Sequence, residues 1–180
     1  KDLCLEGTCI AVNDFKEYLA KVLSNEEIEE AKSYLDSISV VKEGMIAGQF
    51  GVHSMHDITE GGVLGALWEV ANASGKGFIV YKEKMPLTQI TKKICRNFDI
   101  DPLRLISSGS MLITSKNGNK LVSLLNENGI KASIIGEIIS HGGYLVDGSE
   151  KIEVSPPERD ELFVLTEKIN GTFDGYRREQ

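Results

Sequence analysis

Residues 56–62 read His-Asp-Ile-Thr-Glu-Gly-Gly and combine carboxylates, a hydroxyl and two glycines at the predicted junction of a strand with a helix. The first N–H groups of a helix have no partner within it, and the helix dipole is positive there. Two glycines let a ligand approach this backbone closely. Such a helix start can hold a phosphate or an acyl-phosphate-like group. The pattern is neither G-x-G-x-x-G nor a P-loop, so it supports neither of those nucleotide sites.

Asp57 and Glu60 would repel a bare phosphate, and three chemical roles are open to them. They can cap the helix, bind a phosphate-associated Mg²⁺, or accept hydrogen bonds from a substrate. We predict Asp57 and Glu60 as catalytic residues and Thr59, Gly61 and Gly62 as substrate- or phosphate-binding residues. The structural alternative is that Asp57 only caps the helix while the two glycines allow close packing.

A second loop, residues 107–110, reads Ser-Ser-Gly-Ser and precedes a predicted strand. Its hydroxyls and its glycine can bind polar substrate groups, so Ser108 and Gly109 are further binding candidates, although a simple turn explains the pattern too. We predict no metal site in this sequence. His53 and His56 are three apart on a predicted strand and face opposite sides, and the cysteines do not have zinc-site spacing.

Cys95 is surrounded by Lys92, Lys93 and Arg96, which can lower a thiol pKa, but no obvious base accompanies it. Trp68 belongs to a nearly all-apolar helix and is expected in the core rather than on a binding surface.

The elements that must position these residues alternate along the chain, which predicts an α/β (α+β layered sandwich) fold with helices covering one mixed sheet. Ser24 and Glu27 form a capping box that opens the second predicted helix. The tail, residues 170–180, has little to bury and is expected to be mobile. Helices are predicted at residues 14–23, 24–38, 41–49, 60–74, 87–98, 119–128 and 160–169. Strands are predicted at 8–12, 52–58, 77–81, 110–114 and 132–138, with a hairpin formed by 144–146 and 152–154.

Composition limits the partners of this 180-residue chain, whose formal net charge is −7. Residues 1–50 carry five basic and ten acidic side chains, whereas residues 51–150 carry ten of each. Without a basic stripe we expect no nucleic-acid partner, and without a long apolar run we expect no membrane span. Three cysteines, an odd number, indicate a reducing cytoplasm.

Residues 55–69 resemble the glycine-rich motif in the C-terminal domain of the aminoimidazole ribonucleotide (AIR) synthase superfamily. The hydrogenase expression/formation (maturation) proteins and AIR-synthase-related proteins resemble this chain best. Further segments occur in the family's order along the chain: residues 5–8 before the motif, and residues 101–103, 106–112, 129–130, 135–138 and 156–162 after it. The resemblance implies an AIR-synthase-like C-terminal domain at residues 1–165, in which residues 1–12 leave an N-terminal ATP-binding domain. Residues 166–180 complete the last helix and the tail.

The resemblance also implies a function. It suggests the C-terminal domain of an ATP-dependent enzyme, of ligase or dehydratase type, that activates a carbonyl or amide oxygen by phosphorylation. ATP and Mg²⁺ would be bound mainly by the N-terminal domain, which would also form the homodimer. Asp57, Thr59, Glu60, Gly61 and Gly62, with Ser108 and Gly109, would face the cleft between the domains. The 180 residues alone are expected to be inactive.

Two departures leave the substrate open. The sequence ends at Gln180 without the terminal cysteine of hydrogenase-maturation members, which favours a relative with a different substrate over a shortened sequence. Selenophosphate synthesis and thiamine-phosphate phosphorylation are less favoured, because their usual motifs are not in this part of the chain. The alternative from another class is a non-catalytic partner-binding domain that keeps the fold.

Overall fold

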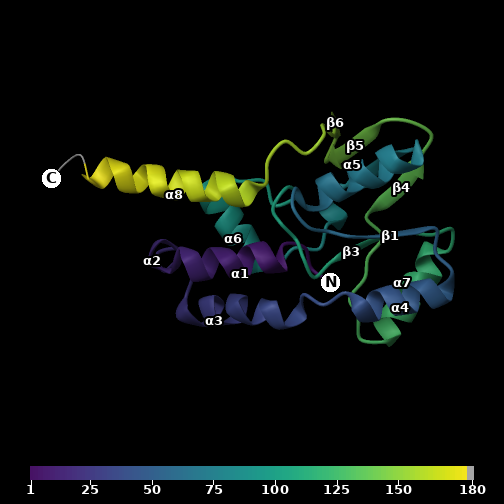
Figure 1. Cartoon of the computed structure of the whole chain (residues 1–180), viewed down its shortest axis with the longest axis horizontal. Helices are drawn as coiled ribbons and strands as arrows, with labels where there is room; N and C mark the ends of the chain where they lie inside the picture. Colours follow the sequence, from purple (N-terminus) through teal and green to yellow (C-terminus); the bar gives the residue numbers. More distant parts are fainter. Residues whose placement is uncertain (178–180) are drawn as a thin grey trace.

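The computed structural model describes residues 1–177, in which four helices precede the first strand and helices then alternate with short strands as far as β4 (Figure 1). The helices are α1 (Leu5–Asp14), α2 (Lys16–Leu19), α3 (Asn25–Ser33), α4 (Val41–Phe50), α5 (Gly62–Ser74), α6 (Gln89–Phe98), α7 (Gly118–Glu127) and α8 (Glu161–Arg177), with 3-10 turns η1 (Tyr34–Ser37) and η2 (Lys82–Lys84). The strands are β1 (Ser54–Asp57), β2 (Gly77–Tyr81), β3 (Met111–Thr114), β4 (Gly136–Ile139), β5 (Gly143–Asp147) and β6 (Glu150–Glu153).

The strands form two sheets, which confirms the mixed α/β class but not the single sheet predicted from the sequence. β1 pairs with β3 in an antiparallel two-stranded sheet, and the other sheet has the order β4-β2-β5-β6. In that larger sheet β2 and β5 are parallel while the other pairs are antiparallel. The units β1-α5-β2 and β3-α7-β4 each place their first strand in one sheet and their second strand in the other. No local sequence pattern shows this division.

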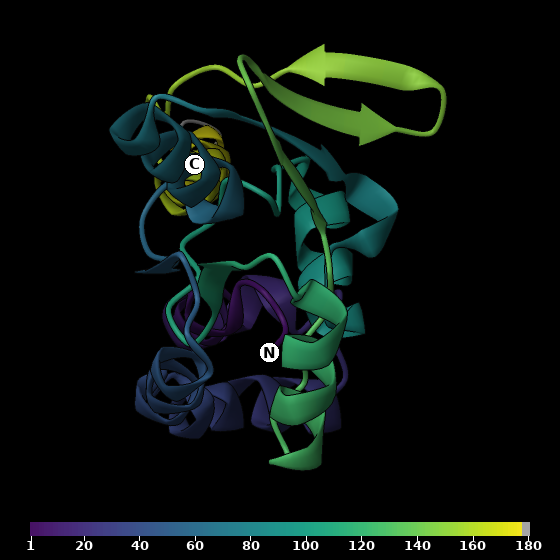
Figure 2. The same ribbon diagram turned by 90° about the vertical axis from the view of Figure 1, so that its right-hand side faces the viewer.

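α5 packs against the larger sheet and contributes much of the main core. Val63 and Leu67 on α5 and Phe78 and Val80 on β2 are all buried in one hydrophobic cluster. A smaller cluster lies where α4 and α7 meet, around Ala47, Leu121, Leu125 and Ile130. Figure 2 shows the β5–β6 hairpin at one edge of the molecule, with α7 and α4 toward the opposite edge. α5 thus carries the glycine motif at its start and anchors that motif in the core.

Three predictions for the N-terminal third are wrong. Residues 8–12 lie inside helix α1 rather than in a strand, because an apolar run of five residues has no periodicity that separates the two states. The predicted helix at 14–23 is reduced to α2. The second predicted helix starts at the Ser24 capping box as expected, but it gives way to η1 at Tyr34, so Leu35 is 53% exposed rather than on a buried stripe.

The C-terminal helix is longer than predicted. α8 runs to Arg177 and projects from the rest of the molecule (Figure 1), so residues 170–177 are helical rather than an irregular tail. The remainder of the predicted tail, residues 178–180, lies outside the described residues.

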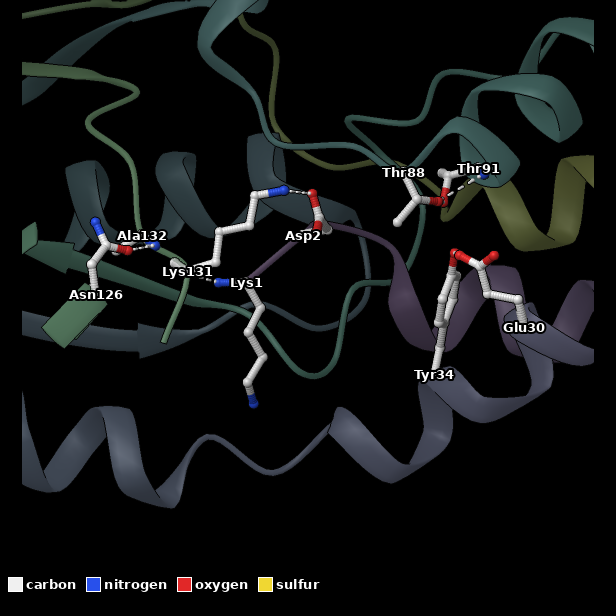
Figure 3. Close-up of polar contacts among 9 residues, drawn as sticks. All are labelled: Lys1, Asp2, Glu30, Tyr34, Thr88, Thr91, Asn126, Lys131 and Ala132. Carbon is white, nitrogen blue, oxygen red and sulfur yellow. Dashed lines mark hydrogen bonds and ion pairs between the residues drawn. The ribbon is translucent and has the colours of Figure 1, made fainter. Parts of the chain in front are cut away.

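The N-terminal residues lie between the α3–α4 region and the segment that leads into β4 (Figure 3). The terminal amino group of Lys1 donates to the carbonyl of Lys131, and Asp2 pairs with the Lys131 ammonium at 2.6 Å. The Lys1 side chain donates to the carbonyls of Ser37 and Ser39. Its Nζ is also 2.9 Å from Oε1 of the buried Glu43, although the two atoms are not aligned for a hydrogen bond. This ion pair fixes the link between η1 and α4.

Candidate functional site

The glycine loop, residues 57–62, connects the end of β1 to the start of α5. Gly61 and Gly62 have φ values of +76° and +62°, a conformation that residues with a Cβ rarely adopt. A Cβ on Gly62 would lie 2.6 Å from the carbonyl oxygen of Leu103. The Leu64 N–H donates to that carbonyl at 3.0 Å. Gly62 is therefore required where the loop packs against the backbone of residues 103–105.

The amides at the start of α5 already have partners within the protein. The Gly61 N–H donates to Oδ2 of Asp160 at 2.8 Å, and the Gly62 N–H donates to the Thr59 carbonyl at 3.1 Å. Both glycines are buried, and Pro157 lies over Gly61. The anion beside this helix start is thus the protein's own carboxylate. In this conformation these two amides are not available to a phosphate.

The predicted catalytic carboxylates lie on the solvent side of the loop. The Asp57 side chain is 65% exposed, Glu60 is exposed and Thr59 is half-buried. Gly61 occupies the N-cap position of α5 and no side chain caps the helix there, so the interpretation of Asp57 as its cap is wrong. No hydrogen bond or ion pair within the described residues engages the Thr59 hydroxyl or the Glu60 carboxylate. These groups are free to meet a ligand from outside.

The second loop adjoins the glycine loop, since the Ile58 N–H donates to the Ser110 carbonyl at 3.0 Å. Ser107 and Ser110 are buried, and their hydroxyl oxygens are 2.8 Å apart. The Ser107 hydroxyl also accepts from the Cys4 N–H, so this pair is structural. The predicted binding residues, Ser108 and Gly109, are not part of this buried hydroxyl pair. Ser108 is half-buried, whereas Gly109 has φ +103° and packs against Ile38.

A histidine–carboxylate pair beside the loop was not predicted from the sequence. His56 Nε2 is 2.8 Å from Oε2 of Glu69 on α5, and His56 Nδ1 contacts the Asp57 carbonyl. Both ring nitrogens therefore face oxygen atoms, which orients the imidazole between the loop and α5. Thirteen residues separate the pair in sequence, so no spacing rule for helices or strands could have found it.

A cleft of about 980 Å³ lies between the β1–β3 sheet and the α5–β2 layer. Its wall is mainly apolar, from residues such as Leu67, Phe78 and Leu112, and His56 and Glu69 also line it. None of the predicted site residues lines this cleft. This cleft and the predicted carboxylates are therefore on different parts of the same strand–helix junction. A second hollow, of about 560 Å³, is lined partly by Trp68, which is half-buried rather than a core residue.

The cysteines are not activated nucleophiles. All three are free and buried, and burial raises the pKa of the Cys95 thiol to about 12. Burial likewise raises the pKa of Cys4 well above its usual value, and the nearby Cys95 thiol and Asp160 carboxylate raise it further. The lysines and arginine around Cys95 in sequence therefore do not lower its pKa. Within the described residues, histidine, cysteine and carboxylate side chains do not gather in a group of three that could hold a metal ion.

The comparisons with known proteins place this geometry in a family. Residues 12–148 match the model of the family described as AIR synthase related protein, C-terminal domain. The chain belongs to this family. The match covers α5 with its glycine loop, the second loop and β5, and it stops before Asp160 and α8.

Curated relatives of this AIR-synthase-related domain include hydrogenase maturation proteins. A putative hydrogenase expression/formation protein of Methanocaldococcus jannaschii is 28% identical over 152 residues, which are 79% of this chain and 45% of the relative. Carbamoyl dehydratase HypE of Rhizobium leguminosarum bv. viciae is 25% identical over 134 residues, or 69% of this chain and 38% of the relative. The chain thus spans less than half the length of these relatives.

Solved structures show the same fold. The crystal structure of Escherichia coli HypE has a TM-score of 0.72 at 22% identity, covering 89% of this chain and 49% of HypE. A structure of the hydrogenase maturation protein HypE in complex with ATP has a TM-score of 0.56 at 22% identity, covering 62% of this chain and 37% of that protein. In the described part of this chain, no helix is both long and apolar enough to cross a membrane.

Proposed function

We propose that the chain is the C-terminal domain of an ATP-dependent, AIR-synthase-like enzyme that activates a carbonyl or amide oxygen by phosphorylation. The family match over residues 12–148, with the glycine loop inside it, is the observation that carries this proposal. The name of the relative HypE, carbamoyl dehydratase, supports it, because removal of water from a carbamoyl group requires an activated oxygen.

The glycine loop contributes side chains rather than amides to the active site. Asp57 and Glu60 act as the catalytic carboxylates and Thr59 as a hydroxyl that contacts the substrate. Gly61 and Gly62 shape the loop by packing against Pro157 and the backbone of residues 103–105, while Ser108 and Gly109 border it from the second loop. The positions of these side chains support this division. Asp57 and Glu60 are exposed, and the Asp57 carboxylate lies 4.0 Å from His56 Nδ1. Within the described residues the Thr59 hydroxyl and the Glu60 carboxylate have no hydrogen-bond partner, whereas the Gly61 and Gly62 amides are occupied.

ATP and Mg²⁺ are the implied cofactors, bound mainly by an N-terminal domain. Mg²⁺ binds carboxylate oxygens together with substrate phosphates. The exposed Asp57 and Glu60 carboxylates fit as additional oxygen ligands to an Mg²⁺ that the N-terminal domain mainly holds. ATP bound with Mg²⁺ supplies the phosphoryl group. Asp57 and Glu60 orient the substrate donor groups, and the buried backbone beneath them keeps the loop in place.

The proposal also includes the partner domain, the oligomeric state and the cellular location of the whole protein. The domain closes on an N-terminal domain that forms a homodimer, and the enzyme functions in the cytoplasm. Three free, buried cysteines agree with a reducing compartment.

The proposal is tested by ATP hydrolysis in the protein that contains this chain and its N-terminal ATP-binding domain. Asp57→Ala is expected to reduce turnover at least tenfold. Asp14→Ala, which removes an exposed carboxylate at the end of α1, is the matched control and is expected to leave turnover unchanged. Undiminished turnover in Asp57→Ala would reject the site.

The second candidate function is a non-catalytic domain that binds a partner. The apolar cleft of about 980 Å³ favours a partner-binding function, because the cleft does not include the glycine-loop carboxylates. Absence of any ATP hydrolysis by the whole wild-type protein would favour this candidate over the enzyme.

A further inference from the structure

We propose that Asp160 is a positioning residue whose buried carboxylate holds the glycine loop in its working conformation and so aims Asp57 and Glu60. The inference rests on the proposed function for its catalytic consequence. The structural part, that Asp160 holds the loop, is independent of that function.

Asp160 connects the starts of two helices. It directly precedes α8 and is 6% exposed. One carboxylate oxygen accepts from the Leu162 N–H of α8 at 2.8 Å, and the other accepts from the Gly61 N–H before α5 at 2.8 Å. A negative charge is stabilised at a helix N-terminus, and here two N-termini share one carboxylate. Hydrogen bonds to an ionised acceptor are about twice as strong as neutral ones.

The surrounding contacts make this carboxylate the centre of a three-segment junction. Pro157 packs over Gly61, where an added Cβ would lie 3.0 Å from the proline Cβ. The Glu161 N–H donates to the Arg104 carbonyl, and the Arg104 guanidinium donates to the Ser155 hydroxyl at 3.1 Å. The glycine loop, the loop at residues 101–106 and the segment at 155–162 are therefore fixed to one another around Asp160.

The glycine loop needs such an external bond. Two consecutive glycines give the backbone wide conformational freedom, and α5 has no side-chain cap of its own. Within the described residues, the hydrogen bonds of the Asp160 carboxylate reach the glycine loop through the Gly61 amide and not through Asp57 or Glu60. Its effect on catalysis must therefore come through the backbone that carries those side chains, which is the work of a supporting residue.

Asp160→Ser separates this role from helix capping. Serine is a good N-cap residue, so the substitution keeps an acceptor for the Leu162 N–H of α8. The serine hydroxyl is one bond shorter and no longer reaches Gly61. Ser24→Ala, which removes the cap of α3 far from the loop, is the matched control for a general loss of stability.

The first readout is hydrogen exchange of individual amides in the 180-residue chain. Asp160→Ser is expected to speed exchange of the Gly61 amide at least tenfold while the Leu67 amide inside α5 keeps its rate. Ser24→Ala is expected to change neither amide. Unchanged exchange at Gly61, or equal acceleration at Gly61 and Leu67, would overturn the inference.

The second readout is ATP hydrolysis by the protein with its N-terminal domain. Asp160→Ser is expected to lower kcat at least tenfold with KM for ATP changed less than threefold. Faster exchange at Gly61 with unchanged kcat would overturn the positioning role. A wild-type protein that does not hydrolyse ATP would reject the proposed function, and the exchange result alone would then decide whether Asp160 holds the loop.

Discussion

Replacement of Gly62 by alanine tests whether the start of α5 depends on close backbone packing. Gly75, after the same helix, has the same φ of +62°, but a Cβ there meets nothing within 4 Å. The two substitutions share the backbone strain of a left-handed residue, about 1–2 kcal/mol. They differ in their surroundings, because a Cβ on Gly62 would lie 2.6 Å from the Leu103 oxygen and 2.8 Å from the Leu105 oxygen.

The additional loss at Gly62 has two sources. Forcing the backbone of residues 103–105 away costs about 1–3 kcal/mol, as overpacking in a core does. The displaced Leu103 carbonyl also loses the hydrogen bond from Leu64, worth about 1 kcal/mol. We therefore expect Gly62→Ala to lower the free energy of unfolding by about 2 kcal/mol or more beyond Gly75→Ala.

Urea denaturation of the two variants measures this difference. For a slope of about 2 kcal/mol per M, the unfolding midpoint of Gly62→Ala should lie roughly 1 M below that of Gly75→Ala. Equal midpoints would refute the argument that Gly62 is required by the Leu103–Leu105 contact.

The remaining predictions concern buried charge and buried thiols. Lys1→Met leaves the buried Glu43 carboxylate without its cation and should lower the free energy of unfolding by about 3 kcal/mol, with much of the loss recovered by Glu43→Met. Lys131→Met, which breaks a more exposed pair with Asp2, should cost less than about 1 kcal/mol in the same urea titration. The pKa of Cys95 is raised to about 12 in the folded state, so stability is fully present below the unfolded-chain pKa of about 8.5 and falls as pH rises toward 12. By pH 10 the Cys95 thiol should account for a loss of about 2 kcal/mol in the free energy of unfolding, so Cys95→Ala should make the fall less steep; an unchanged slope in that variant would contradict the assignment.

Local patterns predicted much of the fold. The strand at Gly77–Tyr81 has the predicted bounds, and Ser24 forms the predicted capping box with Glu27. Both depend on neighbours in sequence: a run of aromatic and β-branched residues after a glycine in one case, and a three-residue spacing in the other. The glycine loop at the β1–α5 junction was found for the same reason, since it combines a turn and a helix start.

What the sequence could not supply are partners that folding brings together. The carboxylate that serves the start of α5 is Asp160, 99 residues from Gly61, rather than the neighbouring Asp57. Glu69 reaches His56 only because α5 folds back along β1. Gly62 was a candidate for ligand approach, yet the backbone that approaches it is that of residues 103–105. In each case the identity of the partner needed the tertiary structure.

The measurement that tests the central claim most directly is a hydrogen-exchange footprint of the protein containing this chain and its N-terminal domain, with and without a non-hydrolysable Mg²⁺–ATP analogue. The glycine loop is proposed to face the nucleotide, so exchange across residues 55–62 should slow when the analogue binds. Residues 132–138, which line the apolar cleft, should keep their exchange rates. Slower exchange at residues 132–138 with no change at 55–62 would contradict the proposed site.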